Sequence, residues 1–157
     1  MGDIRFADFA RKSPVPIDQQ KIGVLVIEDH AGMREGITAM VNAQSDMTVV
    51  GQAGNGQQAI QQFRDLRPDV SLLDWSLPIV QGEEVLRTVN AEVPKPRVIV
   101  MSSLNDEACV QRALSLGAQS YLHKDMLRRE LLPAIRAVHK GQLYLPEEIA
   151  KLLGNGN

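Results

Sequence analysis

Short apolar segments that end in charged or hydroxyl side chains recur along the chain, and they constrain its fold more than any other feature. They lie at residues 22–27, 47–53, 69–73, 98–101 and 120–123. Nearly continuous apolar runs of this length are typical of strands that are buried on both faces of a parallel sheet. Each segment therefore predicts one strand of a shared core.

Apolar residues at helical spacing fill the stretches between these segments. They predict helices at 31–43, around 59–67 ahead of Pro68, around 85–89, at 106–116, at 127–139 and, near the end, at 146–153. Gly117 is expected to cap one helix, and Pro133 should bend the 127–139 helix or delay its start. Strands that alternate with helices predict an α/β fold, a doubly wound five-stranded parallel sheet with right-handed crossovers.

A length of 157 residues suits one compact domain. Residues 1–20 show no lasting periodicity, so we expect a loosely ordered leader, with a short helical turn near Ile4–Phe9. The sheet domain is predicted at 21–140, followed by a linker segment with a short helix at 141–157. Too few residues follow the last predicted helix for a DNA-reading helix-turn-helix, so we expect any such domain outside this chain.

Composition excludes several classes of protein. A formal net charge of −2 shows no basic excess that would mark a nucleic-acid binder. The single cysteine, Cys109, cannot form an internal disulfide or a cysteine-based zinc site. No apolar run approaches the roughly 18 residues of a membrane span, and the N-terminus lacks the apolar core of a secretory signal. These features predict a cytoplasmic protein without a membrane segment.

Polar side chains follow four of the predicted strands. Glu28 and Asp29 follow the first strand, Asp74 the third, Ser102 the fourth and Lys124 the fifth. Ligands of doubly wound sheets bind at the carboxyl ends of the strands, so these side chains should meet at one edge. Any one of them alone would more often be a helix cap, a turn former or a solvated charge; their shared position is what indicates a site.

This set of side chains suits phosphoryl chemistry. Crowded carboxylates repel one another unless a cation joins them, and Mg²⁺ prefers such oxygen ligands. One carboxylate would remain as a nucleophile, as in enzymes that form an aspartyl-phosphate. A hydroxyl and an ammonium group could hold the phosphoryl oxygens.

Four motifs make the interpretation specific. VLVIEDH at 24–30, SLLDWSLPIVQGEEV at 71–85, VIVMSS at 98–103 and GAQSYLHKDM at 117–126 occur in the right order and at the right element ends. Over about 21–140, the chain resembles the receiver domain of bacterial two-component response regulators, whose fold is flavodoxin-like. The resemblance implies phosphoryl transfer from a sensor histidine kinase.

The resemblance also implies a role for each matching residue. Asp74 would be the phospho-acceptor. Mg²⁺ would be held by Asp29, Glu28, Asp74 and the backbone carbonyl of Ser76. Ser102 and Lys124 would contact the phosphoryl oxygens, and Ser102 with Tyr121 would form the switch. Phosphorylation is expected to draw Ser102 inward and let Tyr121 rotate. A homodimer is expected, with the first and last helices as the favoured contact and the face of the fifth strand as the alternative.

The chain departs from the common pattern at a few positions. Glu28 is one methylene longer than the usual aspartate, and Gln81-Gly82 replaces Asp-Gly. Lys124-Asp125 replaces Lys-Pro, which leaves a cis or a trans peptide open. This variant and AIRAVHKGQLYL at 134–145 resemble the branch that precedes a LuxR-type helix-turn-helix DNA-binding domain.

The leading hypothesis is therefore a phospho-accepting domain that regulates transcription through a DNA-binding domain outside this chain. A stand-alone receiver that acts by phosphorelay or protein contact is the alternative. A true phosphatase would need an aspartate at Ser76, so we expect no enzyme activity beyond slow loss of the phosphoryl group. An FMN-binding flavodoxin is disfavoured because Glu28, Asp29 and His30 replace its phosphate loop.

Two positions are expected to control how long the phosphoryl group lasts. Hydrolysis needs a water held in line with the Asp74–phosphorus bond. Ser76 is too short to hold that water, and Leu104 has no polar atom with which to bind it. Trp75 either shields the site or simply packs, and His123 is expected on the surface.

Overall fold

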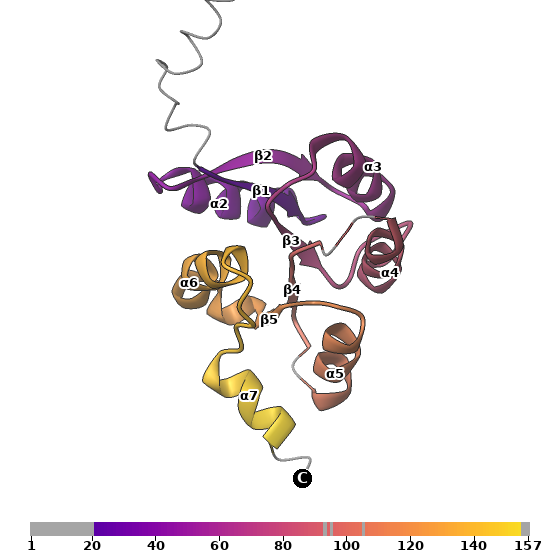
Figure 1. The fold of residues 1–157 in the computed structure, drawn as a ribbon, viewed down its shortest axis with the longest axis vertical. Coiled ribbons are helices and arrows are strands. Elements are labelled where there is room, and N and C mark those ends of the chain that lie inside the picture. Colours follow the sequence, from indigo (N-terminus) through magenta and orange to yellow (C-terminus); the bar gives the residue numbers. More distant parts are fainter. Residues whose placement is uncertain (1–20, 93, 95, 105, 155–157) are drawn as a thin grey trace, which may run out of the picture.

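Five parallel strands form one sheet in the computed structural model, which describes residues 21–92, 94, 96–104 and 106–154 (Figure 1). The strands are β1 (Ile22–Ile27), β2 (Met47–Ala53), β3 (Val70–Asp74), β4 (Val98–Ser102) and β5 (Ser120–His123), in the spatial order β2-β1-β3-β4-β5. The doubly wound fold predicted from the apolar segments is confirmed, and so is the flavodoxin-like class that the resemblance implies. The expected leader at 1–20 lies outside the described residues.

Helices cover both faces of this sheet. One face carries α2 (Ala31–Asn42) and α6 (Leu127–His139), and the other carries α3 (Gly56–Leu66), α4 (Gly82–Glu92) and α5 (Glu107–Ser115). A 3₁₀ turn, η2 (Lys124–Met126), links β5 to α6, and α7 (Glu147–Gly154) packs beside α5 (Figure 1). None of the described helices combines the length and the apolar character that a bilayer crossing requires.

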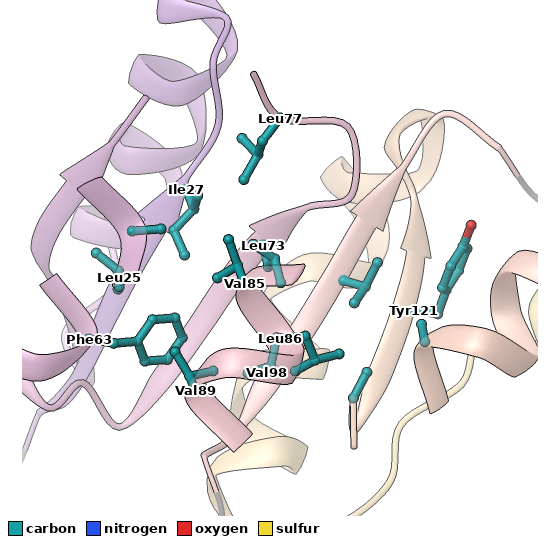
Figure 2. Packing of buried hydrophobic residues seen from close by; sticks show 14 of the residues in the cluster. Leu25, Ile27, Phe63, Leu73, Leu77, Val85, Leu86, Val89, Val98 and Tyr121 are labelled. Carbon is teal, nitrogen blue, oxygen red and sulfur yellow. The ribbon is translucent and has the colours of Figure 1, made fainter. Parts of the chain in front are cut away.

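The core has two layers because successive strand residues point to opposite faces. Leu25 and Ile27 of β1 point to the face that carries α3, α4 and α5, on the side of Phe63 of α3 (Figure 2). Val24 and Val26, their neighbours in sequence, pack toward α2 and α6. All residues of β1, β3 and β4 are buried, which explains why these strands appear in the sequence as continuous apolar runs.

The helix ends follow the local signals. Gly117, at φ +106°, closes α5: its N–H donates to the Leu114 carbonyl, and the Ala118 N–H donates to the Ala113 carbonyl. Helix α6 begins at Leu127 despite Pro133, so the expectation of a later start is wrong. Pro133 is exposed, and the carbonyl that loses its partner to proline can therefore bind water.

The segment after α6 covers part of the β5 edge. The Tyr144 N–H donates to the Gln119 carbonyl at 2.9 Å, and Tyr144 forms an isolated parallel bridge with Ser120. The Tyr144 hydroxyl donates to Glu130 Oε1 at 2.6 Å, and Ile149 of α7 is buried in the same cluster as Tyr121. The outer edge of β5 is therefore paired at the start of the strand rather than open.

Candidate functional site

The carboxyl ends of β1, β3, β4 and β5 are neighbours in the sheet, so the polar residues that follow them lie together. The Lys124 ammonium lies 3.0 Å from Glu28 Oε1 and 3.2 Å from Asp74 Oδ2. Glu28 and Asp74 are buried, and Lys124 is almost buried. The predicted meeting of these side chains at one edge is thus present in the structure.

Burial and ion pairing act in opposite directions on Lys124. Removal from water alone would lower the pKa of its ammonium group. Hydrogen bonding and attraction to Glu28 and Asp74 outweigh that effect, so the pKa of Lys124 is raised. The lysine therefore stays charged and available for an anionic group.

Asp74 is strained electrostatically. Burial, with a smaller contribution from repulsion by Glu28, raises the pKa of Asp74 to about 7. The Ser76 N–H, 3.0 Å from Asp74 Oδ1, and the Lys124 ammonium favour the charged carboxylate and offset part of this rise. Without a metal, the Asp74 carboxyl group therefore holds its proton more tightly than an ordinary aspartate does.

Asp29 completes the acidic group and is its most accessible member. Its side chain is 33% exposed. Burial tends to raise the pKa of Asp29, but hydrogen bonds with Asp74 and Glu28 and attraction to His30 lower it overall. Ligand atoms of Glu28, Asp29 and His30 lie within 4.8 Å of one another, and hydrogen bonding connects Asp29 to Asp74.

The oxygen atoms of this group suit a divalent cation. Glu28 Oε1 and Asp74 Oδ2 are buried, and among the described residues the Lys124 ammonium is the one partner seen for either oxygen. Carboxylate oxygens beside a solvent-facing carboxylate such as Asp29 are ligands that Mg²⁺ accepts, since it keeps several waters. The donor set therefore fits Mg²⁺.

The expected switch residues meet at the loop after β4. Ser102 is buried, and its Oγ accepts the Leu104 N–H at 2.9 Å. The fully buried Tyr121 donates its hydroxyl to the Leu104 carbonyl. Burial raises the pKa of Tyr121, and a hydrogen bond with Ser102 offsets part of that rise. The Leu104 backbone thus connects the two side chains.

The two predicted lifetime positions, Ser76 and Leu104, are both exposed, and Leu104 has 52% of its surface accessible. Trp75 is half-buried and packs against the core cluster on the side of α4 and α5, which supports packing over shielding. The peptide between Lys124 and Asp125 is trans.

Two residues near the site were not found by sequence reasoning. The expectation that His123 lies on the surface is wrong, because its side chain is 17% exposed. Its Nε2 lies 3.0 Å from the Ser103 carbonyl, and its Nδ1 accepts the Asp125 N–H at 3.1 Å. Arg34 of α2 donates from Nη1 to the Glu28 carbonyl at 2.7 Å. Nothing in a single sequence marks either contact.

Comparison with known proteins agrees with this geometry. Residues 24–136 match the response regulator receiver domain family. The nitrate/nitrite response regulator NarL of Escherichia coli (strain K12) is 36% identical over 136 residues, which cover 87% of this chain and 63% of that protein. The transcriptional regulatory protein LiaR of Bacillus subtilis (strain 168) is 36% identical over 129 residues, 82% of this chain and 61% of that protein.

A solved structure adds the same result in three dimensions. The signal receiver domain of NarL from Mycobacterium tuberculosis superposes with a TM-score of 0.75 at 33% identity and covers 78% of this chain and 99% of that one. The chain belongs to the response regulator receiver family. It spans about three fifths of the length of NarL and LiaR.

The raised pKa of Asp74 predicts a pH dependence of stability in the presence of a chelator. Between about pH 4 and 7 the unfolded chain ionises this carboxyl group while the folded chain keeps its proton, so the free energy of unfolding should fall as the pH rises, and level off above pH 7. We expect Asp74→Asn to remove a fall of about 1 to 4 kcal/mol over this window, measured by urea unfolding.

The exposed carboxylate of Asp65 provides the control, as Asp65→Asn changes the charge on the outer surface of α3. Parallel stability curves for the wild type and Asp74→Asn between pH 4 and 7 would show that folding leaves the pKa of Asp74 unchanged.

Proposed function

We propose that this receiver domain accepts a phosphoryl group on Asp74 from a phosphohistidine of a sensor kinase. The observation that carries the proposal is the buried Asp74 carboxylate at the end of β3, beside Lys124 and two further acidic side chains. A carboxylate oxygen of Asp74 attacks the phosphorus, the phosphorus–nitrogen bond breaks and the imidazole leaves with the electron pair. An acyl phosphate then remains on Asp74.

Asp29, Asp74, Glu28 and the backbone carbonyl of Ser76 are the groups that would hold Mg²⁺. When bound, the ion supplies positive charge that offsets the charge of the carboxylates and of the phosphoryl oxygens. Lys124, already held between Glu28 and Asp74, would pair with one phosphoryl oxygen, and Ser102 with another. Ser102 Oγ accepts the Leu104 N–H, a bond that would be exchanged if the side chain turned toward the phosphoryl group.

This exchange supports a switch through the loop after β4. When Ser102 turns toward the phosphoryl group, the Leu104 backbone loses one of its two tethers, and the other is the Tyr121 hydroxyl. A change at Asp74 would thus reach Tyr121 of β5 by way of Ser102 and the Leu104 backbone. The rotation of Tyr121 remains part of this proposal.

The output of such a protein would be transcription. NarL and LiaR are a response regulator and a transcriptional regulatory protein, and this chain covers about three fifths of each. We extend the proposal to DNA binding by an output domain beyond the receiver region at 21–140, with 141–157 as the linker. Action by phosphorelay or direct protein contact is the alternative. Because the phosphohistidine is made from ATP, the proposed site of action is the cytoplasm. We propose no catalytic turnover beyond slow self-dephosphorylation.

A homodimer through α2 and α6 is better supported than one through β5. A groove of about 600 Å³ lies between these helices, and Met33, Ile37 and Leu127 contribute apolar side chains to it. Met33 is 37% exposed. At β5, by contrast, the Tyr144 segment and α7 already cover part of the strand and the adjoining cluster. We therefore place the dimer contact of the phosphorylated form on α2 and α6.

Phosphorylation is tested with Mg²⁺ and acetyl phosphate, followed by intact mass. We expect one added phosphoryl group on the wild type and none on Asp74→Asn or in the presence of a chelator. Asp65→Asn controls for loss of a carboxylate elsewhere. A normal adduct on Asp74→Asn would falsify the assignment of the acceptor.

Dimerisation is tested by analytical ultracentrifugation with and without acetyl phosphate. We expect phosphorylation to produce a dimer that Met33→Lys weakens, because a charge would enter the groove. Leu143→Lys is the matched control: Leu143 is 62% exposed and lies next to the segment that covers β5. Loss of the dimer in Leu143→Lys alone would move the contact to β5, and a monomer under all conditions would exclude dimerisation.

The lifetime of the phosphoryl group is tested by its decay after donor removal. Ser76→Asn combined with Leu104→Glu should supply polar groups that hold the attacking water. One such hydrogen bond, worth about 1 kcal/mol, corresponds to about fivefold faster decay. Leu143→Glu introduces the same charge far from the site. Equal or slower decay in the double variant would show that Ser76 and Leu104 do not control the lifetime of the phosphoryl group.

A further inference from the structure

Arg34 makes a contact beneath the acidic group that the proposed chemistry does not yet use. Its Nη1 donates to the Glu28 carbonyl at 2.7 Å, across six positions of the chain. The Arg34 N–H donates to the His30 carbonyl at 2.9 Å as α2 begins. These two bonds close the turn that carries Glu28 and Asp29.

The Glu28 carbonyl needs this partner. Strand β1 pairs with β2 and β3 only as far as Ile27, and the Glu28 N–H still reaches the Ala53 carbonyl at 3.0 Å. The carbonyl on the other side of Glu28 therefore lies beyond the ladder, in a residue that is fully buried. Buried carbonyl groups are almost always hydrogen-bonded, and the Arg34 guanidinium takes this role.

The end of β2 leaves space for the guanidinium. A Cβ atom on Gly54 would lie 3.3 Å from Arg34 Nη1 and 3.8 Å from Gln58 Oε1. The Gly54 N–H donates to Gln58 Oε1 at 2.9 Å, which holds the glycine backbone in place. Arg34 is thus enclosed between the ends of two strands and is only half-exposed.

The bond acts on Asp29 through geometry. The Glu28 carbonyl belongs to the rigid peptide plane that leads into Asp29, so a donor that fixes the carbonyl also fixes the direction in which Asp29 leaves the strand. The interactions that act on the Asp29 carboxylate itself come from Asp74, Glu28 and His30. Arg34 therefore reaches the carboxylate by way of the backbone.

We propose that Arg34 is a positioning residue for the magnesium site: it holds the Glu28–Asp29 peptide so that the Asp29 carboxylate faces Asp74, and it thereby sets the affinity for Mg²⁺. This inference rests on the proposed function. Groups that orient metal ligands from behind typically change metal affinity by about 10- to 100-fold when they are lost.

The test compares Arg34→Met, which keeps the length and loses the donors, with Arg34→Lys, which keeps one donor. Mg²⁺ is titrated against the fluorescence of Trp75, the only tryptophan, which follows Asp74 directly. Arg34→Met should bind Mg²⁺ about tenfold more weakly, and Arg34→Lys should recover part of the loss. The rate with acetyl phosphate at saturating Mg²⁺ should stay within about twofold of the wild type, because Asp74 and Lys124 are unchanged.

Two further variants separate positioning from charge and from general stability. Gly54→Ala leaves Arg34 intact but crowds its guanidinium, so it should also weaken Mg²⁺ binding, by less than Arg34→Met. Arg87→Met removes an exposed arginine that pairs with Glu83 and Glu84 on α4, and it should leave Mg²⁺ binding unchanged.

The outcomes are distinguishable. Unchanged Mg²⁺ affinity in Arg34→Met, whatever its melting temperature, would overturn the inference and leave Arg34 a structural residue. A lower rate at saturating Mg²⁺ with unchanged affinity would also overturn it. If the wild type binds Mg²⁺ but acetyl phosphate does not modify Asp74, the proposed function fails, while the fluorescence titration still decides the role of Arg34.

Discussion

The Lys124 ammonium, held between the buried carboxylates of Glu28 and Asp74, is the interaction on which the functional edge of this protein depends. Removal of charged groups from water costs several kcal/mol for each ion, and one ammonium cannot fully compensate three carboxyl groups. The result is visible in Asp74, whose pKa burial raises to about 7. The folded chain thus maintains a site whose charge is balanced only when another cation is present. This excess of negative charge favours cation binding beside Asp74. The bound cation would also neutralise the charge of the incoming phosphoryl group.

The sheet can hold these charged side chains together because a packed hydrophobic layer covers each of its faces and keeps it rigid. Two separate hydrophobic layers, on opposite faces of the same strands, fix the directions in which β1, β3, β4 and β5 end. The loops beyond those ends are then tied by few, specific bonds. The Leu104 backbone is tied to Ser102 and Tyr121, His123 lies against the Ser103 carbonyl, and the Glu28 carbonyl is held by Arg34. A stable core therefore supports loops at the carboxyl ends of the strands, and each loop is held by one or two hydrogen bonds.

Sequence reasoning found those site residues whose position follows from the strands. Asp74 is the last residue of β3 and Lys124 the first after β5, so recognising the strands was enough to bring the two together. His123 was misplaced because the alternation of β5 predicts only a face of the sheet, and the acceptors that bury its ring come from the loop after β4 and from the following turn. Arg34 was missed because its partner is a backbone carbonyl, which leaves no trace in residue type.

The sequence by itself determined the strand positions, the parallel α/β class and the set of side chains at the strand ends, because burial on both faces imposes continuous apolar runs and places their carboxyl ends at one edge. Only the tertiary structure decided how those side chains are coupled. It showed that Glu28 reaches Lys124 directly, that Leu104 links Ser102 to Tyr121, and that the segment around Tyr144 covers β5. These contacts depend on atoms that approach to about 3 Å, most of them from elements far apart in the chain, and hydrophobic periodicity carries no information about such distances.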